Sequence, residues 1–383
     1  MAFLRNRSIN WINLHSGIQA LAQGIGGVFV LVYLLRAGVS VPATLCVIAL
    51  IFAGRFVTRP VVLVSAKRWG LKPMAIFGNL LIAMQYPLLA EVHGIDQSLL
   101  AFCLLGALGD AFYWSCYHAY FAVLGDSEHR GHQIGANVAL AALVGIVAPL
   151  LGAWALVGVG PRLAFGAVAV IQALAAVPLL ATPNVFVPPT APHSFSSALP
   201  GILLFMSDSW FAVMYVFVWQ IALFLALGES LSAYGGAMAF AALVGAVSGM
   251  LLGRHIDAGN GIRAVSIAYS VVAVTLVLRA ASLGTPWLAV AANALGALAG
   301  CLLGPVQMTP VYNLAKASPC ATRFLISAEG GWDVGCMCGC LTAAALIAHG
   351  APLSAIIPLG MLGALAQVLL LRRYYARSDS LVT

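Results

Sequence analysis

Long apolar segments separated by short polar ones recur along the whole chain. Each has roughly 20 residues or more, which is the length that a helix needs to cross a hydrocarbon core about 30 Å thick. The segments are continuously apolar rather than alternating, and this pattern is typical of membrane helices and not of barrel strands. We predict twelve spans, at residues 9–35, 40–64, 72–90, 98–124, 133–158, 162–181, 199–226, 231–252, 263–282, 285–314, 324–348 and 352–372.

Composition supports an all-α membrane protein. Of the 383 residues, 62% are hydrophobic and 8% are charged, whereas soluble domains carry about 25% charged residues. The mean hydropathy is +1.01. The first span follows MAFLRNRS without a small-residue cleavage site, so we interpret it as a retained helix and not as a signal peptide.

Basic residues predict the orientation. With a cytoplasmic N-terminus, thirteen Lys and Arg fall on the inner side, and Arg36, Arg162 and Arg279 fall in outer loops. This excess of basic residues inside is the one expected of a multi-pass protein with both termini in the cytoplasm. The net charge of +7 is spread over short segments without interleaved aromatics, which argues against nucleic-acid binding.

The chain carries a weak internal repeat. A shift of 190 residues aligns LRAGVSVPA, residues 35–43, with LALGESLSA, residues 225–233, and aligns GAL at 106–108 with GAL at 296–298. The repeat predicts two six-helix bundles, residues 1–181 and 199–383. The proline-rich segment 182–198 between them reads as a cytoplasmic linker.

Charged residues inside the predicted spans are the strongest functional signal. A charge at mid-membrane costs at least ~2.5–3.5 kcal/mol, so each one should face a partner, water or a ligand. The acids are proton-coupling candidates and the arginines are their possible charge partners: Asp110, Asp208, Glu329 and Asp333, with Arg55 and Arg59. Two alternatives stay open. Asp110 or Asp208 could form a structural ion pair with Arg55, and Glu329 and Asp333 could stabilise the positive end of their helix.

Polar and aromatic residues on spans 1, 4, 7 and 10 suggest a binding cavity. Helical spacing places Trp114 and Tyr117 on the same face as Asp110. The cavity candidates are Gln19, Gln23, Tyr113, Trp114, Tyr117, His118, Tyr215, Trp219, Gln220, Asn293 and Gln307. Ordinary packing is the alternative for the tryptophans, and His15 is expected to cap or pack. Few charges among many aromatics suit a neutral or weakly charged organic solute better than a phosphate.

The organisation and the loop motifs resemble the major facilitator superfamily of secondary transporters over essentially the whole chain. GRHIDAGNGIR, with Gly253, Asp257 and Arg263, resembles a gate-loop motif of that family, and LVSAKRWGLKP keeps Arg68 of the first copy but has Lys67 where the acid should be. Arg130 fits a third loop pattern. In span 5, VGIVAPLLGA resembles a degraded element of proton-driven exporters, although Pro and small residues also serve helix packing.

The resemblance implies the fold of that superfamily and a monomeric transporter in a bacterial-type inner membrane. We expect alternating access to a midplane site, with proton-coupled movement of a small organic solute and with export favoured over import. Uptake by proton symport and a non-transporting receptor or scaffold on the same fold remain alternatives. We expect no enzyme, because we find no HExxH, GxSxG or comparable catalytic motif, and we expect neither a cofactor nor a metal site. The cysteines, CMCGC at 336–340 included, read as inert thiols.

Overall fold

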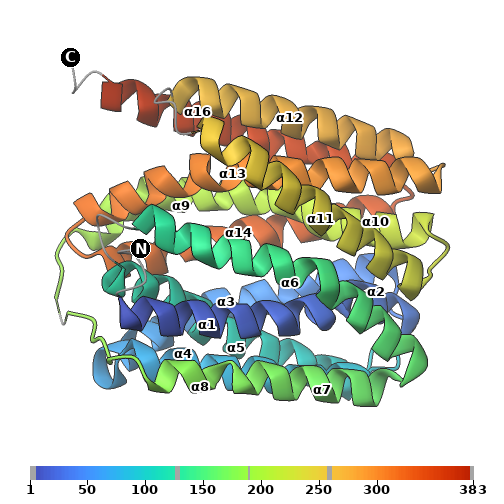
Figure 1. Cartoon of the computed structure of the whole chain (residues 1–383), viewed down its shortest axis with the longest axis horizontal. Coiled ribbons are helices and arrows are strands. Elements are labelled where there is room, and N and C mark those ends of the chain that lie inside the picture. Colours follow the sequence, from blue (N-terminus) through green and yellow to red (C-terminus); the bar gives the residue numbers. More distant parts are fainter. Residues whose placement is uncertain (1–5, 126–129, 189, 257–260, 380–383) are drawn as a thin grey trace.

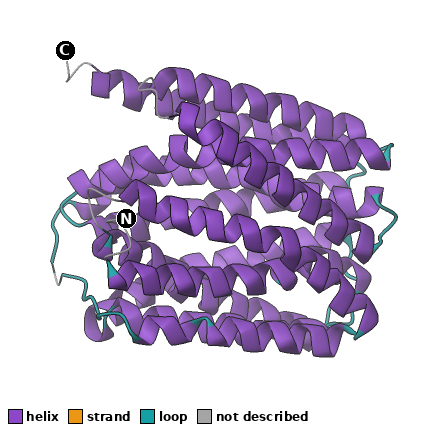
Figure 2. Cartoon of the chain, in the orientation of Figure 1, coloured by secondary structure: helices purple, strands orange, loops and turns teal. Residues whose placement is uncertain are grey.

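The computed structural model describes residues 6–125, 130–188, 190–256 and 261–379 (Figure 1). Within these ranges all regular elements are helices and no strand occurs (Figure 2). The first half contains α1 (Arg7–Ile25), η2 (Gly27–Phe29), α2 (Val30–Arg36), α3 (Val41–Trp69), α4 (Leu71–Ala90), α5 (Gln97–Leu124), α6 (Arg130–Gly158), α7 (Pro161–Leu174) and α8 (Ala176–Leu180). The second half contains α9 (Ser194–Ala212), η3 (Val213–Val218), α10 (Trp219–Ala226), α11 (Leu231–Ile256), α12 (Gly261–Ser282), α13 (Pro286–Ala317), α14 (Ala321–Ala348), α15 (Leu353–Ile356), η4 (Ile357–Leu359) and α16 (Gly360–Asp379).

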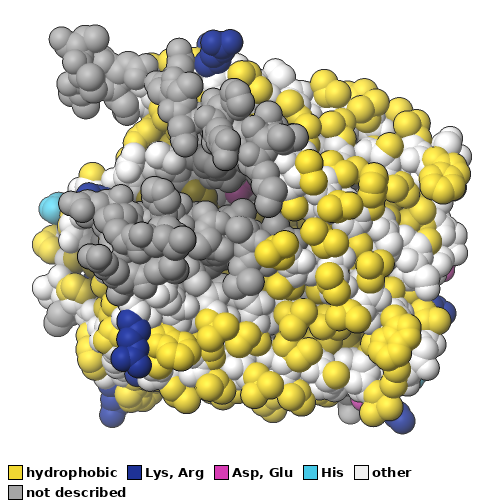
Figure 3. All heavy atoms as spheres, viewed as in Figure 1, with side chains coloured by type: hydrophobic (Ala, Val, Ile, Leu, Met, Phe, Trp, Pro, Cys, Tyr) yellow, Lys and Arg dark blue, Asp and Glu magenta, His cyan; other side chains and the backbone are white. Residues whose placement is uncertain are grey.

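Eleven helical segments of the described chain are long and apolar enough to cross a membrane. The fifth predicted span corresponds to α6, of which the shorter apolar stretch Leu143–Gly158 is described fully. The prediction of a multi-pass α-helical membrane protein is confirmed, and the number twelve stays a prediction. The molecular surface agrees with a lipid environment, because hydrophobic side chains cover much of the face in Figure 3 while Lys and Arg lie near its edges.

Some predicted boundaries were wrong by several residues. The seventh span begins at Ser194 rather than at 199, so the non-helical linker is shorter than the predicted segment 182–198. The last helix continues to Asp379, beyond the predicted end at 372. This last extension, RYYARSD at residues 373–379, is polar and carries Arg373 and Arg377, so hydropathy alone could not place it in the helix.

Helices of the two halves lie side by side in the middle of the molecule. In Figure 1, α12, α13 and α16 form one side and α1, α4, α5 and α7 form the other. Between them, α14 packs on α3 and α11 packs on α6, and these are the main contacts between the first and the second half of the described chain. The division into two six-helix bundles agrees with this packing and remains our interpretation.

The beginning of α1, the joint between α8 and α9, and the end of α16 all lie at the left of Figure 1. Their common position is what an even number of crossings requires. The cytoplasmic placement of both termini stays a prediction, which rests on the distribution of basic residues.

The 190-residue repeat recurs in the backbone of two helix–helix turns. Gly38 (φ 86°) and Gly228 (φ 66°) adopt the left-handed conformation that ends a helix, which glycine adopts without steric cost. Two residues later, Ser40 and Ser230 each start a helix by accepting the backbone N–H three residues on, at 3.4 Å and 3.2 Å. Equivalent residues in the two halves therefore terminate and restart the chain in the same way.

Small residues allow close approach around α6. A Cβ on Gly152 would lie 2.1 Å from the Ile25 carbonyl oxygen, and one on Gly235 would lie 2.7 Å from Ala153 Cβ. The residues of VGIVAPLLGA thus pack tightly against α1 and α11. Packing explains this sequence element, and its relation to export stays a prediction.

Candidate functional site

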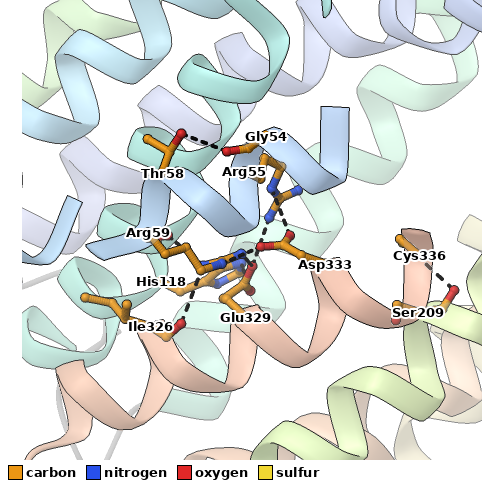
Figure 4. A network of polar contacts seen from close by, with 11 residues as sticks. Gly54, Arg55, Thr58, Arg59, His118, Ser209, Ile326, Glu329, Asp333 and Cys336 are labelled. Carbon is orange, nitrogen blue, oxygen red and sulfur yellow. Dashed lines mark hydrogen bonds and ion pairs between the residues drawn. The ribbon is translucent and has the colours of Figure 1, made fainter. Parts of the chain in front are cut away.

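A cluster of opposite charges joins α3 to α14 (Figure 4). Arg55 and Arg59 lie one turn apart on α3, and Glu329 and Asp333 lie one turn apart on α14, so the two pairs face each other. We call these four residues the charge cluster. Arg55 Nη2 lies 3.2 Å from Glu329 Oε2, and Arg55 Nε lies 3.1 Å from Asp333 Oδ1.

Arg59 contacts both acids and also the fourth span. Its Nε pairs with Asp333 Oδ2, and its Nη2 lies 3.4 Å from Glu329 Oε2. Its Nη1 donates to Ser115 Oγ of α5 at 2.9 Å. The side chains of the charge cluster are at most 8% exposed. Burial of this kind is tolerated because each charge has an opposite partner.

His118 of α5 borders the charge cluster. Its Nε2 lies 3.8 Å from Glu329 Oε1, and its side chain is 28% exposed, more than any member of the cluster. His118 also stacks on Trp114, with ring centroids 5.5 Å apart. Histidine thus connects the buried charges to the aromatic residues of α5 and to a more accessible space.

Asp110 lies one turn before Trp114 and close enough to the charge cluster to interact electrostatically with Arg55, Asp333 and Glu329. It belongs to none of the ion pairs found among the described residues. The hypothesis of an Asp110–Arg55 or Asp208–Arg55 structural pair was therefore wrong. Both partners of Arg55 come from α14, because the two acids there match the spacing of the two arginines.

The aromatic residues of α5 form one contiguous group. Tyr113 and Tyr117 stack with centroids 5.5 Å apart, and Trp114 lies edge-on to both. Tyr113 is fully buried and its hydroxyl bonds His15 Nε2 at 2.7 Å, while His15 Nδ1 lies 2.6 Å from the Ala175 carbonyl oxygen. His15 packs inside the first half, as predicted, and Tyr113 belongs to that core rather than to an open surface.

Asp208 lies in a separate polar network inside the second half. Its Oδ1 accepts from Gln307 Nε2 at 2.9 Å and from Gln367 Nε2 at 3.2 Å. Tyr269 donates to Gln367 Oε1. The four residues come from α9, α13, α16 and α12, so Asp208 does not join the other three acids.

Tyr215 and Trp219 surround a buried arginine that the sequence analysis had placed in an outer loop. Arg279 is 3% exposed, and its guanidinium lies 4.0 Å from the Tyr215 ring centre and 4.7 Å from that of Trp219. Its Nη1 donates to the Tyr215 carbonyl at 2.5 Å, and Trp219 Nε1 donates to Asn293 Oδ1 at 2.9 Å. The prediction for Arg279 was wrong because its position near a helix end does not reveal that the aromatic faces can hold it by cation–π contact.

The sequence matches the family model of the Major Facilitator Superfamily over residues 14–323. This match covers most of the chain. The protein belongs to the Major Facilitator Superfamily. No curated protein sequence matches the chain at a significant level.

Solved structures with this superfamily fold resemble the chain over nearly its whole length. The human organic anion transporter MFSD10 (TETRAN) has a TM-score of 0.73 at 15% identity and covers 95% of this chain and 99% of its own. The POT family transporter PepTSo has a TM-score of 0.67 at 13% identity, with 98% of each chain covered. An auto-inhibited POT family peptide transporter has a TM-score of 0.66 at 14% identity, with 97% of each chain covered.

Membership of the Major Facilitator Superfamily makes this protein a secondary transporter embedded in a membrane, and not an enzyme. Among the predicted gate-loop residues, Arg68 is exposed with its guanidinium 5.3 Å from the Trp69 ring, and Arg263 is also exposed. Asp257 lies outside the described residues, as do the side chain of Arg130 and the surroundings of Gly253. The gate contacts of this superfamily member therefore stay predictions.

The remaining cavity candidates divide between the halves. Gln19 is buried in α1, whereas Gln23 and Gln220 are partly buried. Asn293 and Gln307, both of α13, bond Trp219 and Asp208 and thus hold the second half together. The sequence identifies these polar positions within the helices but does not show which of them bond one another; their place in a solute cavity stays a prediction.

Proposed function

We propose that this protein moves a small organic solute by alternating access, with a proton exchanged at the charge cluster and Asp110. The observation that carries this proposal is the charge balance between α3, α14 and α5. Two arginines face two carboxylates, and Asp110 adds a third acid nearby. A net negative charge in an apolar medium is costly, and one bound proton removes it.

The same residues link proton binding to movement. Arg55 and Arg59 belong to the first half and Glu329 and Asp333 to the second, so any rocking of one half against the other must lengthen these contacts. Protonation of Asp110 or of His118 weakens the electrostatic attraction that keeps Arg55 and Arg59 in place. The proton would thereby shift the equilibrium between the two orientations of the halves.

His118 gives the proton a route. The partly exposed imidazole ring, which can accept and release a proton, lies beside both Glu329 and the aromatic group of α5. Trp114 and Tyr117 are partly buried and pack on the apolar core, so they can offer flat surfaces to a solute of organic character. A neutral or weakly charged molecule fits this surface.

We favour export across a bacterial inner membrane by a monomer, on the basis of the span 5 element and of the basic-residue distribution. The structural relatives are named for organic anions and for peptides. We therefore include both chemical classes, together with organic cations, in the search for the substrate.

A proteoliposome assay tests the proposal. Purified protein is reconstituted with a pH dye inside, and organic anions, organic cations and short peptides are added in turn. We expect at least one compound to drive proton flux through the unaltered protein, and D110N to lose this flux while E91Q, at an exposed loop carboxylate, keeps it. If the solute crosses the membrane equally fast with and without a pH gradient, proton coupling is contradicted. If the solute binds the protein but does not cross the membrane, the result supports a receptor. The sign of the proton flux separates proton antiport from proton symport.

A further inference from the structure

The second half holds a set of oxygen ligands that the proposed proton pathway does not use; Asp208 and Gln307 of this set are partly buried. Asp208, Tyr269, Gln307 and Gln367 converge from four helices, and Tyr269 and Gln367 are 5% and 1% exposed. None of the ion pairs in the described part of the chain includes Asp208. A carboxylate without a cation is costly inside a membrane protein and by default has a function.

Gln307 has more oxygen neighbours than its amide nitrogen has hydrogens. Its Nε2 has three oxygen neighbours: Asp208 Oδ1 at 2.9 Å, the Tyr269 hydroxyl at 3.0 Å and Gln367 Oε1. A carboxamide nitrogen carries two hydrogens, so it can serve two of these acceptors but not all three. Gln367 Oε1 also accepts from the Tyr269 hydroxyl, and Asp208 Oδ1 also accepts from Gln367 Nε2. Three oxygens thus converge on the place of one amide nitrogen, and a small cation can bind several oxygens at such a place.

We propose that Asp208, Tyr269, Gln307 and Gln367 form a binding site for a sodium ion. Hard cations prefer oxygen ligands, and here a carboxylate, a hydroxyl and two carboxamide oxygens are available. Each Gln can present oxygen instead of nitrogen by rotating its terminal amide, which has nearly the same shape in both orientations. The site thus has one arrangement in which the amides donate hydrogen bonds to the carboxylate and one in which they coordinate an ion with it.

Charge and size select a monovalent ion. The single negative charge of Asp208 balances one positive charge, whereas a divalent ion would leave an uncompensated charge in the membrane. A cavity of about 10 Å³ borders Asp208, Gln307 and Gln367, close to the smallest space that holds one water molecule. A compact ion fits this space, and the larger potassium ion fits less well.

The ligands come from α9, α12, α13 and α16, so bound sodium would tie four helices of the second half together. An ion that binds the folded chain and not the unfolded one raises the melting temperature. Sodium should therefore stabilise the protein independently of any transport substrate and independently of the charge cluster.

Thermal unfolding of the purified full chain tests the site. NaCl is titrated at constant ionic strength against choline chloride at pH 7.5, with KCl as the comparison ion. We expect a saturable rise in the melting temperature with sodium, a smaller rise with potassium, and an apparent sodium affinity weakened about tenfold or more in D208N and in Y269F. E91Q, at an exposed carboxylate outside this site and outside the charge cluster, is the matched control and should respond like the unaltered protein.

Several outcomes would overturn the assignment. The first is a melting temperature that is the same in sodium and in choline for the unaltered protein. The second is an unchanged sodium response in both D208N and Y269F. The third is a melting temperature that rises with falling pH and not with sodium, which would make the proton the occupant. The proteoliposome assay reads proton flux and this assay reads sodium binding without flux, so failure of the proposed function and failure of the sodium site are distinguishable.

Discussion

The halves of this transporter meet at two interfaces that the 190-residue repeat relates to each other, and the two are chemically opposite. Between α3 and α14, two arginines and two carboxylates are buried together. Between α11 and α6, the described contacts are made by small residues such as Gly145, Ala153 and Gly235. A repeated backbone thus provides one interface whose energy depends on protonation and another whose energy depends on shape.

The two interfaces should therefore have different roles when the halves move. Small residues approach closely and lose little when helices slide, because their contacts are weak and numerous. Ion pairs in a low-dielectric region are strong and depend on the charge of each member. We therefore expect the helices to slide past each other at the α6–α11 interface. We expect the strength of the α3–α14 interface to change when a proton binds.

The largest effect is expected at Asp333. D333A leaves two arginines with one acid in the charge cluster, and loss of one partner of a buried pair costs about 3–5 kcal/mol. The free energy of unfolding, from denaturant titration in detergent, should fall by this amount. The double variant R59M/D333L removes a matched pair and should recover most of the loss. If the double variant is as unstable as D333A, the loss comes from disturbed packing and not from an unpaired arginine.

A smaller effect is expected at Gly235 of the small-residue interface. A Cβ there would lie 2.7 Å from Ala153 Cβ and 2.8 Å from the Pro149 carbonyl oxygen, and overpacking of this kind costs about 1–3 kcal/mol. The adjacent Gly236 has open space around it, so G236A should keep or raise the melting temperature. If G235A and G236A unfold at the same temperature, the helices do not approach as closely as described.

The Trp219–Asn293 hydrogen bond lies within the second half, so its loss serves as a reference for changes at the two interfaces between the halves. W219F removes the 2.9 Å hydrogen bond to Asn293, and the loss of one such bond costs about 0.5–1.5 kcal/mol. Since this bond does not join the halves, proton flux in proteoliposomes should persist. Loss of flux at unchanged stability would place Trp219 in the solute path instead.

The smallest effect is expected for an ion pair at the aqueous edge. Glu91 accepts from Arg162 at 2.7 Å and 2.8 Å, and this contact lowers the pKa of the Glu91 carboxyl. Because the folded-state pKa is depressed, the contribution is complete above the unfolded value of about 4.3 and disappears as the pH falls through the folded value. R162A should change the melting temperature little at pH 7, and less still at high salt. A large change would mean that exposed pairs matter as much as the charge cluster.

The fold was readable from the sequence because lipid imposes simple rules on length and hydropathy. The repeat at Gly38 and Gly228 was also readable, since a left-handed turn needs glycine and the next helix needs a serine cap. The pairing of the buried charges could not be predicted from the sequence. Arg55 has the same chemistry whether its partner is Asp110 or Asp333, and helix rotation, which hydropathy does not encode, decides between them.

The same limit explains Asp208 and Arg279. Asp208 lies inside a span and Arg279 near the end of one, where we had assigned it to an outer loop, and the sequence shows no charged partner for either. Asp208 is surrounded by amides and a tyrosine from three other helices, and Arg279 by two aromatic rings from the seventh span. Neutral partners of this kind leave no charge pattern that a sequence reader could match.

The seventh span contains a π-helical segment, Val213–Val218, between α9 and α10. Such a segment accommodates one residue more than an α-helix of the same rise. Deleting one residue there would let the segment close into a regular α-helix and would leave the helices on either side in their present orientation. In a regular α-helix, which has 3.6 residues per turn, the same deletion would turn everything beyond it by about 100°. The widened segment can therefore absorb the loss of one residue while Trp219 keeps its place opposite Asn293.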